Sequence, residues 1–297
     1  VEERRGCVFR CAFCSYHTLN THRQKSSERI VEELTNLKKL GYNKVNFTGA
    51  EFLAPPKKCR KTLELIIDAD LNMDLLGYAR IDILHKHPDM IDLMAKAGFT
   101  AAYFGVESGD QTILKAMDKN FNIEKCLPEV LEKLKKYNID VWASFIFGYP
   151  GETKDTIKNT TNFITSCNFT VLDVHALQVV PGTPLDLKRE KYGLKTLGNF
   201  WAHPTMSMRE IPKIMREVFV NIYKNCDSSV LHIRDHLGKY FPQKDKSKET
   251  SRAIDRCLHE LIYIEFNDSI KSKEEHLLKS WNNLKKHIEY IPSYILK

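Results

Sequence analysis

The sequence predicts an α/β protein built on parallel strands, with a helical extension toward its C-terminal end. Strand-like and helix-like segments alternate through the first two-thirds of the chain, which indicates parallel strands joined by right-handed crossovers. Apolar runs such as AAYFGV and ASFIFG are typical of strands covered on both faces. Beyond about Lys188 the alternation stops. A doubly wound sheet and a barrel share this pattern, and periodicity does not separate them.

The predicted elements follow one another in a regular order. The strands are VEERRG, taken as the end of a truncated first strand, and then 44–48, 74–79, 101–106, 140–147 and 171–180. The helices between them are 28–40, 57–68, 88–97, 111–117, 123–137 and 154–167. Ser26 and Ser27 precede the first helix and Gly41 ends it, while Pro55 and Pro56 suit the start of the second.

The tail reads differently from the first part of the chain. Amphipathic helices are predicted over 211–224, 251–266 and 274–290, with an exposed polar loop at 242–250. We therefore expect two units, a strand–helix core over 1–187 and a helical extension over 188–297. The chain begins at Val1, without methionine and inside a strand, so we also expect a further domain upstream in a longer protein.

The composition is that of a cytoplasmic enzyme. Hydrophobic residues make up 42% of the chain and charged residues 28%, and neither a membrane span nor a signal peptide is visible. The net charge of +7 is spread along helices, so it gives no strong nucleic-acid signal. Five cysteines are scattered singly, as reduced thiols usually are: Cys59, Cys126, Cys167, Cys226 and Cys257.

The run CVFRCAFC carries the strongest chemical signal. Its cysteines, Cys7, Cys11 and Cys14, have the spacing C-x3-C-x2-C, which suits an iron–sulfur cluster with one iron that lacks a protein ligand. An open coordination position is where a small molecule can bind and react, as at catalytic zinc. The alternative is a zinc site completed by His17 or His22. A disulfide is disfavoured because three neighbouring cysteines cannot all pair.

This loop resembles the cluster-binding loop of radical SAM enzymes, which has the same spacing and an aromatic residue before the last cysteine, here Phe13. The resemblance implies a 4Fe–4S cluster whose open iron is chelated by S-adenosylmethionine (SAM). It implies reductive cleavage of SAM to a 5′-deoxyadenosyl radical, with electrons from a donor such as flavodoxin or ferredoxin. It also implies a partial barrel of six βα units, with the chemistry at the carboxyl ends of the strands.

Two motifs at predicted strand ends are similar to SAM-binding positions of this family. In TGAE, the resemblance assigns Gly49, Ala50 and Glu51 to the methionyl ammonium, with Ala50 replacing the usual second glycine. In YARID, Arg80 could fork onto the SAM carboxylate. The alternatives are a surface glutamate after a turn and a local salt bridge from Arg80 to Asp82.

Three further strings complete the resemblance, which spans residues 5–185. GVESG offers Glu107 and Ser108 to the ribose or methionyl group. FIFGYPGET offers Ile146 and the Gly148 turn to the adenine, although Ser144 replaces a glycine and Glu152 lies one place late. VVPGTPL places Val179 on the last strand, which borders the adenine in many relatives.

The strand strings resemble the branch of the family that often carries an upstream cobalamin-binding domain. That branch implies methylation of an unactivated centre in a small molecule or natural product. The alternatives are a cobalamin-independent lyase, oxidase or methylthiotransferase, and a non-enzymatic iron–sulfur or zinc module for redox sensing or nucleic-acid binding. In the tail, WAHPTMS over 201–207 is interpreted as a connector between helices, with Trp201 as a packing anchor and His203 as structural. The alternative is that this segment forms part of a substrate pocket beyond the barrel.

Overall fold

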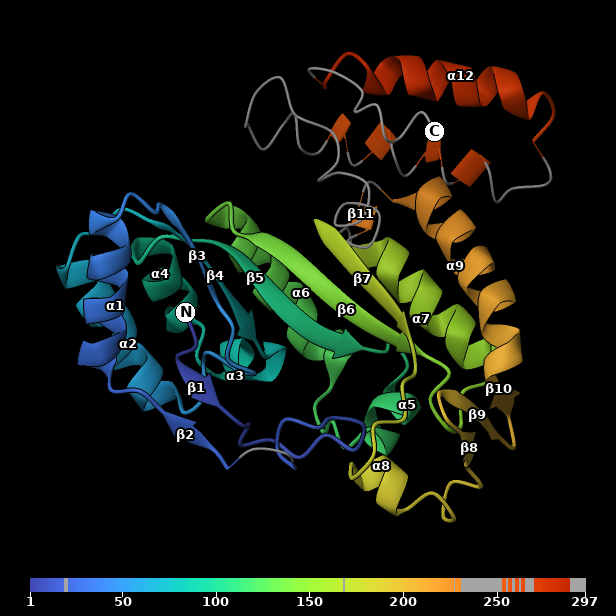
Figure 1. Ribbon diagram of the computed structural model, residues 1–297, viewed down its shortest axis with the longest axis horizontal. Helices are drawn as coiled ribbons and strands as arrows, with labels where there is room; N and C mark the ends of the chain where they lie inside the picture. Colours follow the sequence, from blue (N-terminus) through green and yellow to red (C-terminus); the bar gives the residue numbers. More distant parts are fainter. Residues whose placement is uncertain are drawn as a thin grey trace.

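The computed structural model describes residues 1–18, 21–167, 169–226, 228–230 and 270–288, together with parts of 253–264. Within these residues the main sheet is parallel and has the order β11-β7-β6-β5-β4-β3. Its strands are β3 (Lys44–Phe47), β4 (Asp74–Ala79), β5 (Phe99–Glu107), β6 (Asp140–Phe147), β7 (Val171–Ala176) and β11 (Ser229–Val230). Strands β3 to β7 neighbour one another in chain order (Figure 1), which confirms the predicted α/β partial barrel.

Helices connect these strands and cover one side of the sheet (Figure 1). They are α1 (Ser27–Lys39), α2 (Pro56–Asp68), α3 (Ile81–Lys86), α4 (Asp89–Lys96), α5 (Gln111–Ala116), α6 (Ile123–Lys136) and α7 (Lys154–Cys167). Side-chain caps fix where α1 and α6 begin: the Ser26 hydroxyl accepts the N–H of Arg29 at 3.1 Å, and Asn122 accepts that of Lys125. None of the described helices has the length and apolarity needed to cross a membrane.

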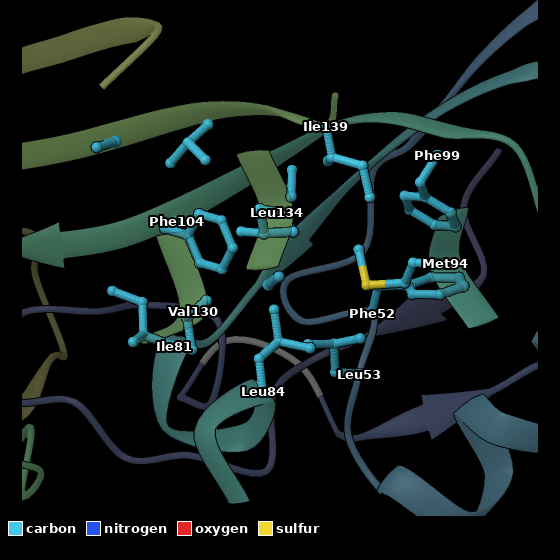
Figure 2. Close-up of a cluster of buried hydrophobic side chains, with 14 of the residues drawn as sticks. Phe52, Leu53, Ile81, Leu84, Met94, Phe99, Phe104, Val130, Leu134 and Ile139 are labelled. Atoms are coloured by element: carbon cyan, nitrogen blue, oxygen red, sulfur yellow. The ribbon is translucent and has the colours of Figure 1, made fainter. Parts of the chain in front are cut away.

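The two faces of the sheet differ because successive side chains of a strand point to opposite sides. In β6, Ala143, Phe145 and Phe147 are fully buried in the main core. Figure 2 shows Phe104 of β5 in the same core, facing apolar side chains of α3 and α6. Burial of each such large side chain stabilises the fold by about 1.5–3 kcal/mol. The opposite face, which we call the inner face, carries polar residues such as Ser144 at the alternate positions.

The beginning of the chain differs from the prediction of a first barrel strand. Arg4–Arg5 forms β1, which pairs antiparallel with β2 (Arg23–Gln24) in a separate sheet. The ammonium of Val1 donates to the Asn46 carbonyl at 2.7 Å, and the Thr48 N–H donates to the Val1 carbonyl at 3.0 Å. The first residue therefore lies along the edge of β3, but the chain turns away before a ladder forms. The sixth strand of the described sheet is instead β11, beside β7.

The tail contains short strands as well as helices. After α8 (Pro184–Leu187) come β8 (Lys195–Leu197), β9 (Phe200–His203) and β10 (Met206–Ser207), a turn of 3-10 helix at Met208–Glu210, α9 (Ile211–Asn225) and α12 (Lys273–Leu284). Helices α9 and α12 confirm two of the predicted tail helices. The predicted loop 242–250 lies outside the described residues, as does much of the predicted helix 251–266.

The segment 201–207 connects two helices, α8 and α9, as predicted, and it does so through short strands. Strands β8, β9 and β10 form an antiparallel sheet in which Leu197 pairs with Phe200 and His203 with Met206. The reason lies in packing: Trp201 is 3% exposed and its indole N–H donates to the Leu177 carbonyl at 2.9 Å. Alternating buried and exposed positions along β9 make this segment a strand rather than a loop.

Candidate active site

The three cysteines of the motif lie in one loop between β1 and β2, and all are free thiols. Backbone hydrogen bonds at Ala12 fix the loop on both sides. Its N–H donates to the Met117 carbonyl at 3.0 Å, and its carbonyl accepts the N–H of Leu185 at 2.8 Å. Met117 and Leu185 belong to segments that follow β5 and β7. The cysteine loop is thereby held near the carboxyl ends of the strands.

Two of the three thiols, Cys7 and Cys14, sit in a setting that favours their neutral form until a metal binds. Burial raises the pKa of Cys14 to about 11 and also raises the pKa of Cys7. The Cys7 sulfur accepts the backbone N–H of Phe9 at 3.4 Å. Because metal ligands must be thiolates, binding of a metal here would release protons.

A 4Fe–4S cluster and a single zinc ion need different arrangements of their ligands. The thiolates of a 4Fe–4S cluster bind different iron atoms, whereas the ligands of zinc all lie within about 2.3 Å of one ion. The described part of the chain, which includes the three cysteines and both nearby histidines, holds no set of three His, Cys, Asp or Glu side chains close enough for a single metal ion. His22 lies instead against Gln24, at 3.3 Å between the Nε2 atoms.

Arg80 reaches the cysteine loop from the end of β4. Its Nε donates to Asp82 Oδ1 at 2.9 Å and its Nη2 donates to Oδ2 at 3.2 Å. The guanidinium is thus paired with Asp82 through two hydrogen bonds. Its Nη1 lies 3.7 Å from the sulfur of Cys11, and its plane stacks over the ring of Phe9, 3.9 Å from the centroid. The salt bridge to Asp82 that the sequence allowed is present, beside a contact to a predicted cluster ligand.

The TGAE turn after β3 is tightly enclosed. Glu51 is 3% exposed, accepts the N–H of Leu53 at 3.0 Å, and has its pKa raised to about 8 by burial. The buried Glu3 accepts the N–H of Gly49 at 3.0 Å, and a Cβ at Gly49 would lie 2.1 Å from Oε1 of Glu3. Only glycine fits this close approach. Sequence reasoning missed Glu3, because a glutamate before the motif has no signal of its own.

The polar residues after β5 divide between two environments. Glu107 forms a buried ion pair with Lys119 at 3.0 Å and also accepts the Ser144 hydroxyl at 3.4 Å. Its φ of +71° is unusual for a residue other than glycine. Ser108 instead exchanges a hydrogen bond with Thr160 of α7 at 2.9 Å. The structure therefore brings Glu107 to the strand end and turns the Ser108 hydroxyl toward the helix layer. Lys119 was also missed, because its partner is distant in sequence.

The turn after β6 is fixed from both sides. Gly148 has φ +96°, and the buried Glu152 carboxylate accepts the N–H groups of Gly148 and Tyr149. On the other side, His203 Nε2 lies 3.1 Å from the Gly148 carbonyl, and the rings of Trp201 and His203 stack 5.3 Å apart.

Three apolar positions predicted to contact the cofactor pack against one hydrophobic cluster. Phe13, Ile146 and Val179 are partly buried, and all pack against the same hydrophobic cluster below the Gly148 turn. The predicted positions Cys7, Cys11, Cys14, Gly49, Ala50, Glu51, Arg80, Glu107, Ile146, Gly148 and Val179 come from the cysteine loop and from strand ends. An enclosed carboxyl, a guanidinium beside a thiol and an apolar surface are together suited to a ligand with charged and aromatic ends.

Comparison with known proteins identifies the family. Residues 4–164 match the sequence profile of the radical SAM superfamily. The chain belongs to this superfamily. Radical SAM enzymes use a 4Fe–4S cluster and SAM, and the matched residues contain the cysteine loop and the strand ends β3 to β6.

Radical SAM relatives with curated names include methylases and methylthiotransferases. The chain is 29% identical to the hopanoid C-2 methylase of Rhodopseudomonas palustris over 61% of this chain and 35% of that protein. It is 28% identical to the tRNA-2-methylthio-N(6)-dimethylallyladenosine synthase of Petrotoga mobilis over 60% of this chain and 43% of that protein. The chain thus spans less than half the length of either relative.

Solved structures share the fold at low identity. The radical SAM methyltransferase TsrM from Kitasatospora setae, solved with cobalamin and a 4Fe–4S cluster, superposes with a TM-score of 0.60 at 18% identity, over 67% of this chain and 41% of that one. The cobalamin-dependent SAM radical enzyme OxsB superposes with a TM-score of 0.63 at 15% identity, over 96% of this chain and 49% of that one.

Proposed function

We propose that Cys7, Cys11 and Cys14 hold a 4Fe–4S cluster and that the surrounding strand ends bind SAM. The observation that carries this proposal is the anchoring of three free thiols at the strand ends through both backbone groups of Ala12. When bound, the cluster supplies the electron that cleaves SAM to a 5′-deoxyadenosyl radical. Eight free thiols suit a reducing compartment, and we propose the cytoplasm, with flavodoxin or ferredoxin as the electron donor.

The residues around the loop have separable tasks in this proposal. The Gly49–Glu51 turn accepts the SAM ammonium, because a buried carboxyl with a raised pKa gains most from a cationic partner. Glu107 accepts a hydroxyl or ammonium while Lys119 holds its position. The apolar surface of Phe13, Ile146 and Val179 excludes water on the adenine side. The Ser108 hydroxyl would have to leave Thr160 before it could contact SAM. We therefore assign Ser108 the weakest contact with SAM among these residues.

We further propose that the complete protein methylates a small molecule with the help of cobalamin. Support comes from the hopanoid C-2 methylase among the relatives, and from two cobalamin-associated enzymes, TsrM and OxsB, among the structural neighbours. Cobalamin would supply the methyl group, and the protein would orient the substrate carbon on the inner face of the barrel.

The cluster assignment is tested by anaerobic reconstitution with iron and sulfide. We expect about four irons per chain, and loss of the cluster and of 5′-deoxyadenosine release when any one of the three motif cysteines is replaced by alanine. Cys59→Ala is the matched control, because it removes a fully buried thiol of the main core and should leave iron content unchanged. A stable zinc ion with no iron uptake, or a loaded cluster without SAM binding, would contradict the proposal.

The methyl-transfer assignment needs the complete gene product. It is purified with added hydroxocobalamin, and its absorption spectrum and turnover products are recorded. Retained corrinoid, together with S-adenosylhomocysteine beside 5′-deoxyadenosine, would support methyl transfer. Absence of both would favour a lyase or oxidase that needs no cobalamin.

A methylthiotransferase is the second candidate, because a tRNA methylthio synthase is among the relatives. Methylthiotransferases carry a second cluster, which needs further cysteine ligands. Within this chain Cys226 and Cys257 stand alone in sequence, so those ligands would have to lie outside it. An iron count of about eight per complete protein, instead of about four, would favour this candidate.

A further inference from the structure

A polar cluster on the inner face has no part in the SAM site described above. Asp173 of β7 accepts the phenol O–H of Tyr103 from β5, and its Oδ1 lies 2.8 Å from Nε2 of His175. The Asp173 side chain is 8% exposed, whereas that of His175 is 39% exposed. We call Tyr103, Asp173 and His175 the Asp173 cluster. A buried carboxylate thus holds an accessible imidazole in a fixed orientation.

Strand register places this cluster directly beside the proposed SAM site. Ser144 pairs with Asp173, and Ile146 pairs with His175, across the β6–β7 ladder. Adjacent strands lie about 4.8 Å apart, so His175 is one strand away from Ile146 on the same face. Ser144 in turn donates to Glu107, which continues the polar path to the end of β5.

Packing alone does not account for the cluster. The opposite face of β7 presents Leu172 and Val174 to the main core. Where the strand contributes to packing alone, its side chains are therefore apolar. A buried carboxylate costs free energy unless its partners compensate, and apolar residues of similar volume are often as stable. Asp173 instead orients two proton-bearing groups, one of which stays accessible.

Aromatic side chains adjoin the cluster on the same face. The rings of Tyr78 and Tyr103 lie 4.7 Å apart at 53°. Trp142 pairs with Tyr103 across the β5–β6 ladder and is half-buried. Such rings pack edge-to-face or offset against another aromatic ring, which adds about 0.5–1.5 kcal/mol beyond burial. This surface therefore favours a flat, unsaturated molecule over a saturated one.

We propose that the Asp173 cluster is the polar end of the substrate site, where His175 hydrogen-bonds an oxygen attached to the ring of an aromatic substrate that lies against Tyr78 and Tyr103. The assignment of this site to the substrate rests on the proposed radical SAM function. The hydrogen bond that His175 donates to the Asp173 carboxylate raises the pKa of His175, so the imidazole tends to keep a proton with which to bind an oxygen acceptor. Asp173 is a positioning residue, since it acts through His175.

The test uses cluster-loaded protein with SAM, labelled with ¹⁵N-histidine, and a pair of probes. The probes are p-cresol, which has an aromatic ring with an oxygen, and toluene, which has the same ring without it. We expect p-cresol to shift the ring nitrogen signals of His175 and to bind at least fivefold more tightly than toluene. His175→Gln, whose amide can still donate to Asp173, should lose that preference.

His85→Gln is the matched control, because His85 also pairs with a carboxylate, Glu129 at 3.0 Å, but lies in the helix layer. It should keep the preference for p-cresol. Tyr103→Phe is a second variant that removes one donor to Asp173, and it should weaken p-cresol at least twofold. Equal affinity for the two probes, or an unchanged preference in His175→Gln, would overturn the proposal. The readout needs no turnover, so its outcome is separate from the failure of methyl transfer.

Discussion

The guanidinium of Arg80 lies 3.7 Å, measured from Nη1, from the sulfur of Cys11. The Nε and Nη2 atoms of Arg80 both donate to the Asp82 carboxylate. Because the guanidinium is planar and rigid, this pairing directs Nη1 toward the thiol of Cys11. Hydrogen bonds to the sulfur ligands are one of the means by which a protein sets the reduction potential of an iron–sulfur cluster.

Arg80→Lys should therefore lower the midpoint potential of the cluster. A cation that donates to a ligand sulfur favours the more negative, reduced cluster, and losing about 1 kcal/mol of this preference corresponds to about 40 mV for one electron. Redox titration followed by EPR measures the shift. Arg60→Lys, in an ion pair with Asp89 far from the loop, is the control. An unchanged potential with much weaker SAM binding would show that Arg80 serves the SAM carboxylate instead.

The ion pair of Glu107 and Lys119 allows ligand binding to be separated from stability. Glu107→Gln leaves the buried ammonium of Lys119 without a counter-charge, with the Gly105 carbonyl as its remaining acceptor, and should cost about 3–5 kcal/mol of unfolding free energy. Adding Lys119→Met should recover most of this loss. SAM affinity, measured by equilibrium dialysis, should stay lower by about 1–3 kcal/mol in both variants, because each lacks the carboxylate. Full recovery of SAM binding in the double variant would assign Glu107 to structure alone.

Glu152 should make the stability of the fold depend on pH. Burial raises its pKa to about 7, above the value of 4.5 expected for the unfolded chain. Its contribution is therefore fully present below pH 4.5 and is lost as the pH rises through 7. The loss amounts to about 3 kcal/mol. Urea unfolding from pH 4.5 to 8 should show a flatter profile for Glu152→Gln, while the exposed Glu190→Gln should keep the slope of the parent protein.

Two glycines with positive φ provide a matched pair of alanine variants. A Cβ at Gly148 would lie 2.4 Å from the ring of Trp201, whereas one at Gly182 would meet nothing within 4 Å. Gly182→Ala should cost only the backbone penalty of about 1–2 kcal/mol. Gly148→Ala should cost about 1–3 kcal/mol more and weaken SAM binding, because the turn must shift. Equal losses of unfolding free energy in the two variants would show that the ring moves aside freely.

Local patterns made much of this fold predictable. Short segments rich in apolar residues predicted strands β3 to β7. Their order follows from the alternation with helices such as α1 and α6. The cysteine loop was predictable because its chemistry depends on spacing within eight residues, from Cys7 to Cys14.

Features that depend on distant partners were not predictable. Strand β11 is two residues long and exists only because β7 offers an edge. Glu3 and Lys119 matter through Gly49 and Glu107, which lie far from them in sequence. Asp82, by contrast, is a near neighbour of Arg80, and the sequence already allowed this salt bridge as an alternative.

The contacts of β9 with the Gly148 turn have a practical consequence for anyone who shortens this chain. Trp201 and His203 lie well past residue 187, yet they close the turn that follows β6. A fragment ending at Leu187 would expose apolar side chains to water, among them Tyr149 and Leu177, which are fully buried in the longer chain. Such a fragment would keep every motif by which the superfamily is recognised, and would still lack the two side chains that hold the Gly148 turn of the proposed SAM site.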